Sequence, residues 1–143
     1  MNHYDHTETG WVIIWTVLAA AALGAAAGGL AGSPVAYIVP AVLLVVLVNF
    51  YKLRVTVDGE SVRLYMGMGL IRRTVRLADV ASAGGVRGTL LWGWGIHYVG
   101  GGWIYNVSSM DNVELKFRSG GRLLIGTDDQ AGLLAAITPR LAG

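Results

Sequence analysis

WVIIWTVLAA AALGAAAGGL AGSPVAYIVP AVLLVVLVNF YKLRVTVD, residues 11–58, is the stretch that decides the fold. No charged side chain occurs from Thr9 to Tyr51. This run is too long for one membrane span, because about 20 apolar residues cross the hydrocarbon core. The Gly-Ser-Pro sequence at 32–34 interrupts it, since Gly and Ser favour a turn and Pro suits the start of a helix. We therefore predict a hairpin of two transmembrane helices, at about Trp11–Ala31 and Pro34–Tyr51.

Two other interpretations of this stretch, a buried helix pair and a cleaved signal peptide, require features that the sequence lacks. A buried helix pair in a water-soluble protein needs a polar face toward water, and neither segment has one. A cleaved signal peptide needs Lys or Arg before its apolar part, and residues 1–8 contain neither, although the small residues at 25–27 resemble a cleavage site. The two-span hairpin therefore remains the prediction.

The charge distribution predicts how the hairpin is oriented. Asp5 and Glu8 are the only charged side chains before Lys52, whereas all 11 Lys and Arg residues lie from Lys52 onward. Aromatic residues mark one interface, as in a membrane belt: Trp11, Trp15, Phe50 and Tyr51. The positive-inside rule then predicts a multi-pass protein of the cell inner (plasma) membrane with both termini cytoplasmic.

Residues 1–10 are predicted to form a polar tail in front of the hairpin. The tail contains two histidines, His3 and His6. On so short a polar terminus we expect both side chains to be solvated, and we do not expect a metal site.

Helix one carries a stripe of small residues, Gly24, Gly28 and Gly32. Their i, i+4 spacing places them on one face and permits the close approach of another helix. Packing against helix two of the same hairpin and dimerisation in the membrane both remain open. Pro40 lies inside helix two and is expected to kink it.

After Tyr51 the apolar period changes from that of a helix to two, which is typical of strands with one buried face. Strands are expected at 52–57, 61–66, 71–77, 96–99, 103–107, 113–118 and 122–126. Residues 79–83 are a further candidate, and the glycine-rich stretch at 84–88 is expected to be flexible. Residues 127–130, Thr-Asp-Asp-Gln, resemble a capping box, so a helix should follow with Leu133 and Ile137 on one apolar stripe.

The predicted fold class is therefore α+β, with the transmembrane hairpin at 11–51 and a β domain at 52–143. About seven short strands precede the C-terminal helix. A meander rolled into a barrel has open ends, and a helix in this place is suited to plug one of them.

Short sequence blocks in this domain resemble a known group of proteins. The blocks are GWGI at 93–96, GWIYNVS at 102–108, VEL at 113–115 and LIGT at 124–127. They are similar to those of small bacterial membrane proteins with two transmembrane helices and a PH-like domain. The resemblance covers about residues 52–138 and the two spans. It implies a seven-stranded PH-like β-barrel or sandwich with a capping C-terminal helix, and it brings no established activity. His97 departs from the Arg expected at that position, which puts an anion-binding role there in doubt.

A catalytic set is hard to assemble from this sequence. There is no cysteine, which excludes thiolate nucleophiles, disulfides and Cys-type zinc sites. Ser108 and Ser109 lack a nucleophile-elbow context, and His97 would need an orienting acid such as Asp111 or Glu114. The glycines at 84–88 lack the strand–loop–helix frame of a phosphate loop. We predict a protein that is not an enzyme and needs no cofactor or metal.

Basic side chains gather on the first strands after the hairpin: Lys52, Arg54, Arg63, Arg72, Arg73 and Arg76. They are candidates for binding an anionic lipid or a protein partner, and the alternative is a solvated sheet face. Trp92, Trp94 and Trp103 are expected to fill the core, with a platform that dips into lipid as the alternative. Nucleic-acid binding is not expected, because the positive charge is modest and the membrane limits access.

These observations predict a membrane-anchored, non-enzymatic adaptor that binds a protein partner or membrane lipid. The alternative is a structural subunit of a homo-oligomer or hetero-oligomer in the membrane. An enzyme that acts on lipid or on an envelope precursor is a third hypothesis.

Overall fold

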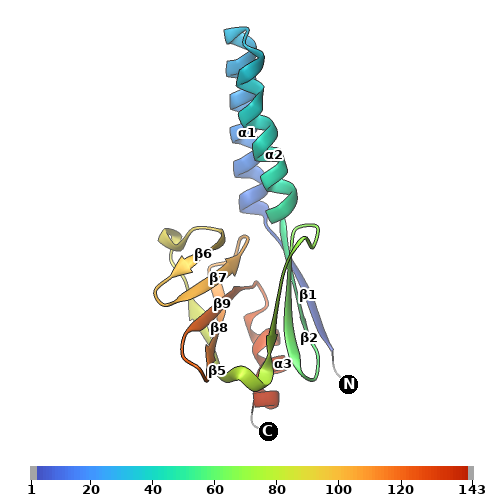
Figure 1. Ribbon diagram of the computed structural model, residues 1–143, viewed down its shortest axis with the longest axis vertical. Coiled ribbons are helices and arrows are strands. Elements are labelled where there is room, and N and C mark those ends of the chain that lie inside the picture. Colours follow the sequence, from blue (N-terminus) through green and yellow to red (C-terminus); the bar gives the residue numbers. More distant parts are fainter. Residues whose placement is uncertain (1–2, 142–143) are drawn as a thin grey trace.

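The computed structural model describes residues 3–141 and has an α+β architecture in two parts (Figure 1). A helical hairpin projects from one end of a domain that consists of two β-sheets and a C-terminal helix. The hairpin contains α1 (Trp11–Ala31) and α2 (Ile38–Phe50), joined through a 3-10 turn at Pro34–Tyr37. The C-terminal helix is α3 (Gln130–Leu141).

Helix α1 has the bounds that the sequence predicts. By length and composition it is long and apolar enough to cross a membrane. The second apolar stretch, Pro34–Phe50, is shorter. Most side chains of α1 are exposed, and Ala21 and Gly28 are its buried residues. A core helix of a water-soluble protein buries its apolar face, so this exposure sets the hairpin apart from such a helix.

Helix α2 begins later than predicted, because residues 34–37 form a 3-10 turn. Pro40 therefore lies in the first turn of α2 rather than in the middle of a longer helix. The first N–H groups of an α-helix have no partner within the helix, so a proline at such a position costs no helical hydrogen bond. Pro40 is thus the third residue of α2 and does not interrupt the interior of the helix.

The segment predicted as a polar tail contains strand β1 (Tyr4–Thr9), which pairs antiparallel with β2 (Lys52–Val57). Thr9 lies opposite Lys52, so the chain enters and leaves the hairpin through neighbouring strands. The N–H of Gly10 donates to the carbonyl oxygen of Tyr51 at 2.8 Å and closes this base. The two ends of the hairpin are therefore fixed side by side on one domain.

The described residues form nine strands in two sheets, where seven strands were predicted. Sheet A has the order β1-β2-β3-β4, with β3 at Ser61–Met66 and β4 at Ile71–Arg76. Sheet B has the order β5-β8-β9-β7-β6, and its only parallel pair in the described part of the chain is β7 with β9. The strands of sheet B are β5 (Val80–Arg87), β6 (Gly95–Val99), β7 (Gly102–Asn106), β8 (Asp111–Phe117) and β9 (Arg122–Gly126).

The glycine-rich stretch predicted to be flexible belongs largely to β5. Gly84 pairs with Glu114 of β8. A Cβ added at Gly85 would lie 2.9 Å from the side chain of Gln130, the first residue of α3. The Nε2 of Gln130 donates to the carbonyl oxygen of Asn112 at 2.7 Å. Glycine at this position permits close packing of the helix on the sheet. Gly85 therefore reflects this packing and not the flexibility that was predicted for residues 84–88.

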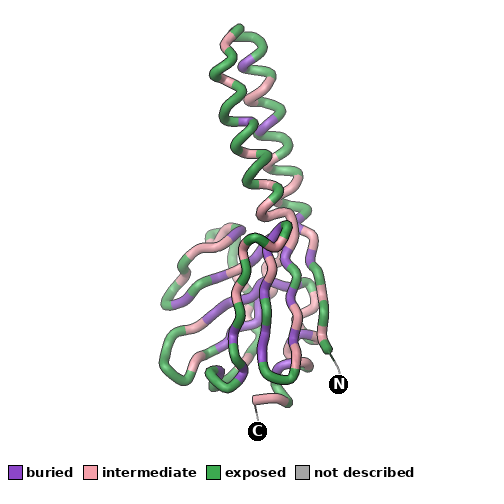
Figure 2. The backbone as a smooth tube through the Cα atoms, turned by 45° about the vertical axis from the view of Figure 1, so that its right-hand side comes forward, coloured by how far each residue is buried: buried purple, intermediate pink, exposed green. Residues whose placement is uncertain are grey.

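The core lies between the two sheets, and α3 closes it on one side (Figure 2). Leu133 and Ile137 of α3 are fully buried, as the helical stripe predicts. The helix is capped by Asp129 rather than by Thr127, since Oδ1 of Asp129 accepts the N–H of Gly132 at 3.1 Å. Thr127 instead accepts the N–H of Asp129 through its hydroxyl oxygen at 3.0 Å.

Candidate functional site

Five of the six predicted basic residues lie on the outer face of sheet A. The strand registers place Arg54 level with Tyr65 and Arg72, and Thr56 level with Arg63 and Thr74. Lys52 and Arg76 share this face by the same alternation. Arg73 differs, because it pairs with the buried Leu64 and its guanidinium lies 5.8 Å from the ring centre of Tyr105 in sheet B.

Three of the outward cations are paired with carboxylates. Arg54 donates through Nε to Asp5 of β1 at 2.8 Å. Asp58 contacts Arg63 at 3.1 Å, and Asp79 contacts Arg76 at 3.0 Å. Lys52 and Arg72 have no carboxylate partner among residues 3–141. The outer face is thus a mixed-charge surface, with its unpaired cations at the end nearest the hairpin.

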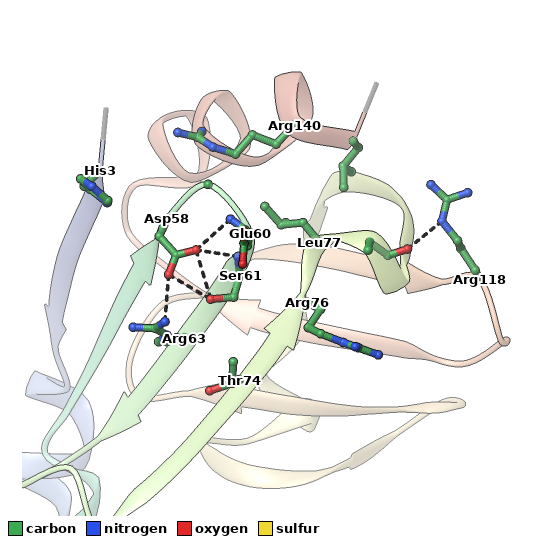
Figure 3. Close-up of a pocket in the computed structure, with 13 residues that line it drawn as sticks. His3, Asp58, Glu60, Ser61, Arg63, Thr74, Arg76, Leu77, Arg118 and Arg140 are labelled. Atoms are coloured by element: carbon green, nitrogen blue, oxygen red, sulfur yellow. Dashed lines mark hydrogen bonds and ion pairs between the residues drawn. The ribbon is translucent and has the colours of Figure 1, made fainter. Parts of the chain in front are cut away.

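A cleft of about 840 Å³ opens at the opposite end of the domain, and we call it the distal cleft (Figure 3). It lies between the β2–β3 turn, the 3-10 turn at Leu77–Asp79 and the end of α3. Arginines from four separate elements line it: Arg63, Arg76, Arg118 and Arg140. Hydroxyl groups of Ser61 and Thr74 and the acids Asp58 and Glu60 complete the lining.

The arginines of the distal cleft are held by partners in the wall. The carboxylate of Asp58 accepts the backbone N–H groups of Glu60 and Ser61 at 2.8 and 2.7 Å. These hydrogen bonds, with a smaller contribution from Arg63, lower the pKa of Asp58, so it stays charged beside Arg63. Arg118 donates through Nε to the carbonyl oxygen of Ala78 at 3.0 Å. Because four arginines face two acids in the lining, the cleft carries net positive charge and suits a carboxylate or phosphate group.

The small-residue stripe of α1 is used mainly within the hairpin. A Cβ at Gly24 would lie 3.1 Å from Pro40, and one at Gly28 would lie 2.9 Å from Cβ of Ala36. Gly32 ends α1 in the left-handed conformation, with φ of 62°, and has open space around it. Gly24 and Gly28 therefore pack against the second arm, whereas Gly32 is a helix C-cap.

We expect Gly28→Leu to weaken the hairpin and Gly29→Leu to affect it little. The larger side chain at Gly28 must displace Ala36, and overpacking of this kind costs about 1–3 kcal/mol. A Cβ at Gly29 meets only the Tyr37 hydroxyl at 3.4 Å, an ordinary contact. Thermal unfolding of the full chain in detergent, followed by helical circular dichroism, measures the difference. Equal melting temperatures for the two variants would contradict this packing.

Three side chains of β1 point toward the interior of the domain and form a polar cluster. The Tyr4 hydroxyl donates to Oδ2 of Asp129 at 3.1 Å, and Nε2 of His6 lies 2.5 Å from Oδ1 of Asp128. His6 is thus half-buried and contacts a carboxylate, whereas His3 is exposed. These contacts fasten β1 to the loop between β9 and α3.

Glu8 is the third inward side chain of β1 and is only 4% exposed. Burial, together with the charge of Asp128, raises its pKa to about 7, although the backbone N–H of Ser109 opposes this by donating to the carboxylate. Its Oε2 has no hydrogen-bond partner among residues 3–141. Burial, with Asp129, also raises the pKa of Tyr4. A carboxylate so enclosed is not reached by a substrate, so we assign the cluster to stability.

The residues considered for catalysis have structural contacts. The Ser109 hydroxyl donates to the carbonyl oxygen of Thr127 at 2.9 Å and accepts the N–H of Asp111 at 3.1 Å. Glu114 lies within 3.6 Å of Arg122. His97 is in β6 opposite Ile104 of β7, with its Nε2 buried. The residues that the structure describes contain no cluster of three His, Asp or Glu side chains suited to a metal ion.

The three tryptophans of the β domain are not in the core, which corrects the core-filling prediction. Trp92 is half-buried, and Trp94 and Trp103 are exposed. Nε1 of Trp94 donates to the carbonyl oxygen of Ser108 at 3.2 Å. Trp103 packs edge-to-face on Tyr98 at 5.8 Å between ring centres. The core is filled by aliphatic side chains instead.

Sequence reasoning missed both the cluster on β1 and half of the distal cleft. The alternation of Tyr4, His6 and Glu8 with Asp5 and Thr7 was a signal of period two, hidden by the polarity of all these residues. Arg118 and Arg140 are far from Arg63 in sequence, and only the fold brings them together. No protein-family model, curated protein or solved structure matches this chain.

Proposed function

We propose that this protein is a membrane-anchored, non-enzymatic adaptor whose β domain binds an acidic segment of a partner protein in the distal cleft. One observation carries the proposal: the apolar hairpin is at one end of the domain, and the β2–β3 turn and the end of α3, which line the arginine-rich cleft, are at the other (Figure 1). A hairpin held in the membrane would leave the cleft facing the aqueous phase.

The exposed apolar surface of the hairpin supports the anchor. Side chains such as Leu23 and Leu30 are 73% and 94% exposed, and an apolar surrounding would remove this surface from water. With its 3-10 turn, Pro34–Phe50 rises roughly 27 Å, close to the thickness of the hydrocarbon core. Cleavage after α1 would separate β1 from its partner β2, which favours a retained anchor over a signal peptide.

The membrane orientation and the finer fold belong to the same proposal. The cations from Lys52 onward favour a cytoplasmic β domain at a cell inner membrane, and the pairing of β1 with β2 supports a topology with both hairpin ends on one side. Two packed sheets closed by a C-terminal helix support a PH-like fold. The described chain departs from the seven-stranded PH-like pattern in having nine strands, one of which, β1, comes from the segment before the hairpin.

The position of the distal cleft favours a protein partner over a lipid. Arginine pairs with carboxylate in two parallel hydrogen bonds, and the cleft has four arginines in its lining against two acids, although Arg63 and Arg76 already contact Asp58 and Asp79. A lipid headgroup in the membrane that holds the hairpin lies at the other end of the domain. An oligomer built through the glycines of α1 is less favoured, since Gly24 and Gly28 contact α2.

A charge-reversal series tests the cleft. We expect Arg118→Glu and Arg76→Glu each to lower the affinity of the full chain, in nanodiscs of zwitterionic lipid, for a poly-glutamate peptide by about tenfold. Arg72→Glu is the matched control, because Arg72 lies on the same sheet outside the cleft. Fluorescence anisotropy of the labelled peptide measures the binding. An equal loss in the control, or no binding by the unaltered protein, contradicts the proposal.

Photo-crosslinking in the native membrane identifies whether the partner is a protein, a second copy of this chain or a lipid. A crosslinking residue replaces Thr74 in the cleft, and the same residue at Thr56 on the same face is the control. An adduct at position 74 alone with a protein that has an acidic segment supports the adaptor. Adducts with a second copy of this chain indicate the structural subunit, and adducts with lipid indicate lipid binding.

A further inference from the structure

Large apolar side chains are exposed on the loops at the hairpin end of the β domain. We call these residues the apolar rim: Met68, Leu70, Leu90, Leu91 and Trp94. They come from the β3–β4 turn, from the 3-10 turn at Leu90–Trp92 and from the residue before β6. Leu91 is 97% exposed, which is as open as a side chain in an unfolded chain.

The opposite end of the domain has a different surface. Its turns are Asp58-Gly59-Glu60 between β2 and β3, and Ser119-Gly120-Gly121 between β8 and β9. Single exposed leucines are common on soluble proteins and need no explanation. Here five exposed apolar residues lie on the loops at the hairpin end while the turns at the other end are polar, and that asymmetry points to an apolar environment at the hairpin end. Tyr98 and Trp103 of β6 and β7 are exposed as well, but they pack on each other edge-to-face and are not part of the rim.

The β3–β4 turn and the loop between β5 and β6, which carry the apolar rim, lie on opposite sides of the base of the hairpin (Figure 1). The N–H of Gly67 donates to the carbonyl oxygen of Lys52 at 2.8 Å, and a Cβ at Gly67 would lie 2.2 Å from the carbonyl oxygen of Asn49. This fixes the turn with Met68 against the end of α2. On the other side, Trp94 and side chains of both hairpin helices line an apolar cleft of about 380 Å³.

We propose that the apolar rim inserts into the membrane–water interface beside the hairpin, so that lipid covers it. The proposal rests on the membrane anchor proposed above. Leucine, methionine and tryptophan are suited to this depth, and Trp94 keeps its indole N–H bonded to Ser108 while 38% of the residue stays exposed. The cleft between Trp94 and the hairpin is lined mainly by apolar side chains and is open to a lipid tail.

Cations accompany the apolar rim at the level expected for headgroups. Lys52 begins β2, Arg72 follows Leu70 at the start of β4, and Arg87 ends β5 just before Leu90. None of the three has a carboxylate partner in the part of the chain that the structure describes. Basic residues so placed attract anionic lipid. Apolar insertion on two sides of the hairpin would keep the domain from tilting and would hold the distal cleft at a fixed distance from the membrane.

Spin labels on single cysteines test this directly, because the natural chain has no cysteine. The full chain is reconstituted in vesicles of zwitterionic and anionic lipid and labelled at Met68→Cys, Leu91→Cys, Leu23→Cys in α1, or Ser119→Cys in the distal β8–β9 turn. The ratio of collisions with oxygen to collisions with a water-soluble nickel complex reports depth. We expect positions 68 and 91 to lie between position 23, in lipid, and position 119, in water.

The outcomes separate this proposal from the anchor. If positions 68 and 91 are as open to the nickel complex as position 119 while position 23 is in lipid, the rim proposal is wrong and the anchor stands. If position 23 is also in water, the anchor is wrong. To show that the label itself does not drive insertion, Leu70→Asp with Leu90→Asp should return position 91 to the value of position 119. Ser119→Asp should leave position 91 unchanged, and an unchanged value in the rim variant would overturn the proposal.

Discussion

Glu8→Gln is expected to stabilise the protein near pH 8 by at most about 3 kcal/mol and to remove a fall in stability between about pH 4.5 and 7. Glu8 has its pKa raised from 4.5 to about 7, mainly by burial. In this window the folded state keeps a proton on Glu8 that the unfolded chain has already lost. The contribution of the neutral carboxyl is therefore full below pH 4.5 and is lost as pH rises to 7. Glutamine resembles the neutral form at every pH.

Denaturant unfolding of the full chain in detergent, followed by tryptophan fluorescence at several pH values, measures this effect. His6 and Asp128 are present in both proteins, so the difference between the two curves isolates Glu8. Glu60→Gln, which changes an exposed acid in the β2–β3 turn, is the matched control and should keep the pH profile of the unaltered protein. Parallel curves for the unaltered protein and Glu8→Gln would show that the Glu8 carboxyl is hydrated.

Leu133→Ala is expected to lower the free energy of unfolding by about 2–5 kcal/mol. Leu133 is fully buried in the core cluster, which includes side chains of both sheets. Truncation removes apolar contact within the core and leaves a cavity that the packed surroundings fill only in part. Because α3 also contacts β1, we further expect β1 to exchange its amide hydrogens faster.

The same unfolding experiment, with hydrogen exchange added, checks the result. Thr138→Ala is the control on the solvent side of α3, and surface changes of this kind stay within about 0.5 kcal/mol. A cost for Leu133→Ala as small as that of the control would mean that α3 packs only loosely on the domain.

Much of this fold is local enough to be predicted. The bounds of α1 follow from an uninterrupted apolar run and a glycine that can adopt the left-handed conformation at Gly32. The meander of β2, β3 and β4 follows from alternation with polar turns, and each strand pairs with its neighbour in sequence. These elements were predicted because short-range pattern and final pairing agree.

The sequence-based predictions were wrong in two situations. In one, a strand pairs with a segment far away in the sequence, and in the other, the same residue type is compatible with two different structural roles. Strand β1 pairs across the whole hairpin, so nothing near it in sequence shows its partner. Gly85 was predicted to lie in a flexible stretch, but it is part of β5 and allows Gln130 to pack closely on this strand. The tryptophans were predicted to fill the core, because large aromatic side chains often do, but Trp94 is exposed and lies beside the hairpin. Arg73 was grouped with its neighbours and points to the other face.

The sequence by itself determined the apolar hairpin, the α+β class and the basic character of the segment that follows, because these depend on composition and on periods of a few residues. Only the tertiary structure decided which cations meet. It gathered Arg63, Arg76, Arg118 and Arg140 in the distal cleft and paired Arg54 with Asp5 across two strands. It also enclosed Glu8 and placed the apolar rim at the hairpin end. Burial and charge proximity are properties of pairs of distant segments, so they exist only once the sheets have packed.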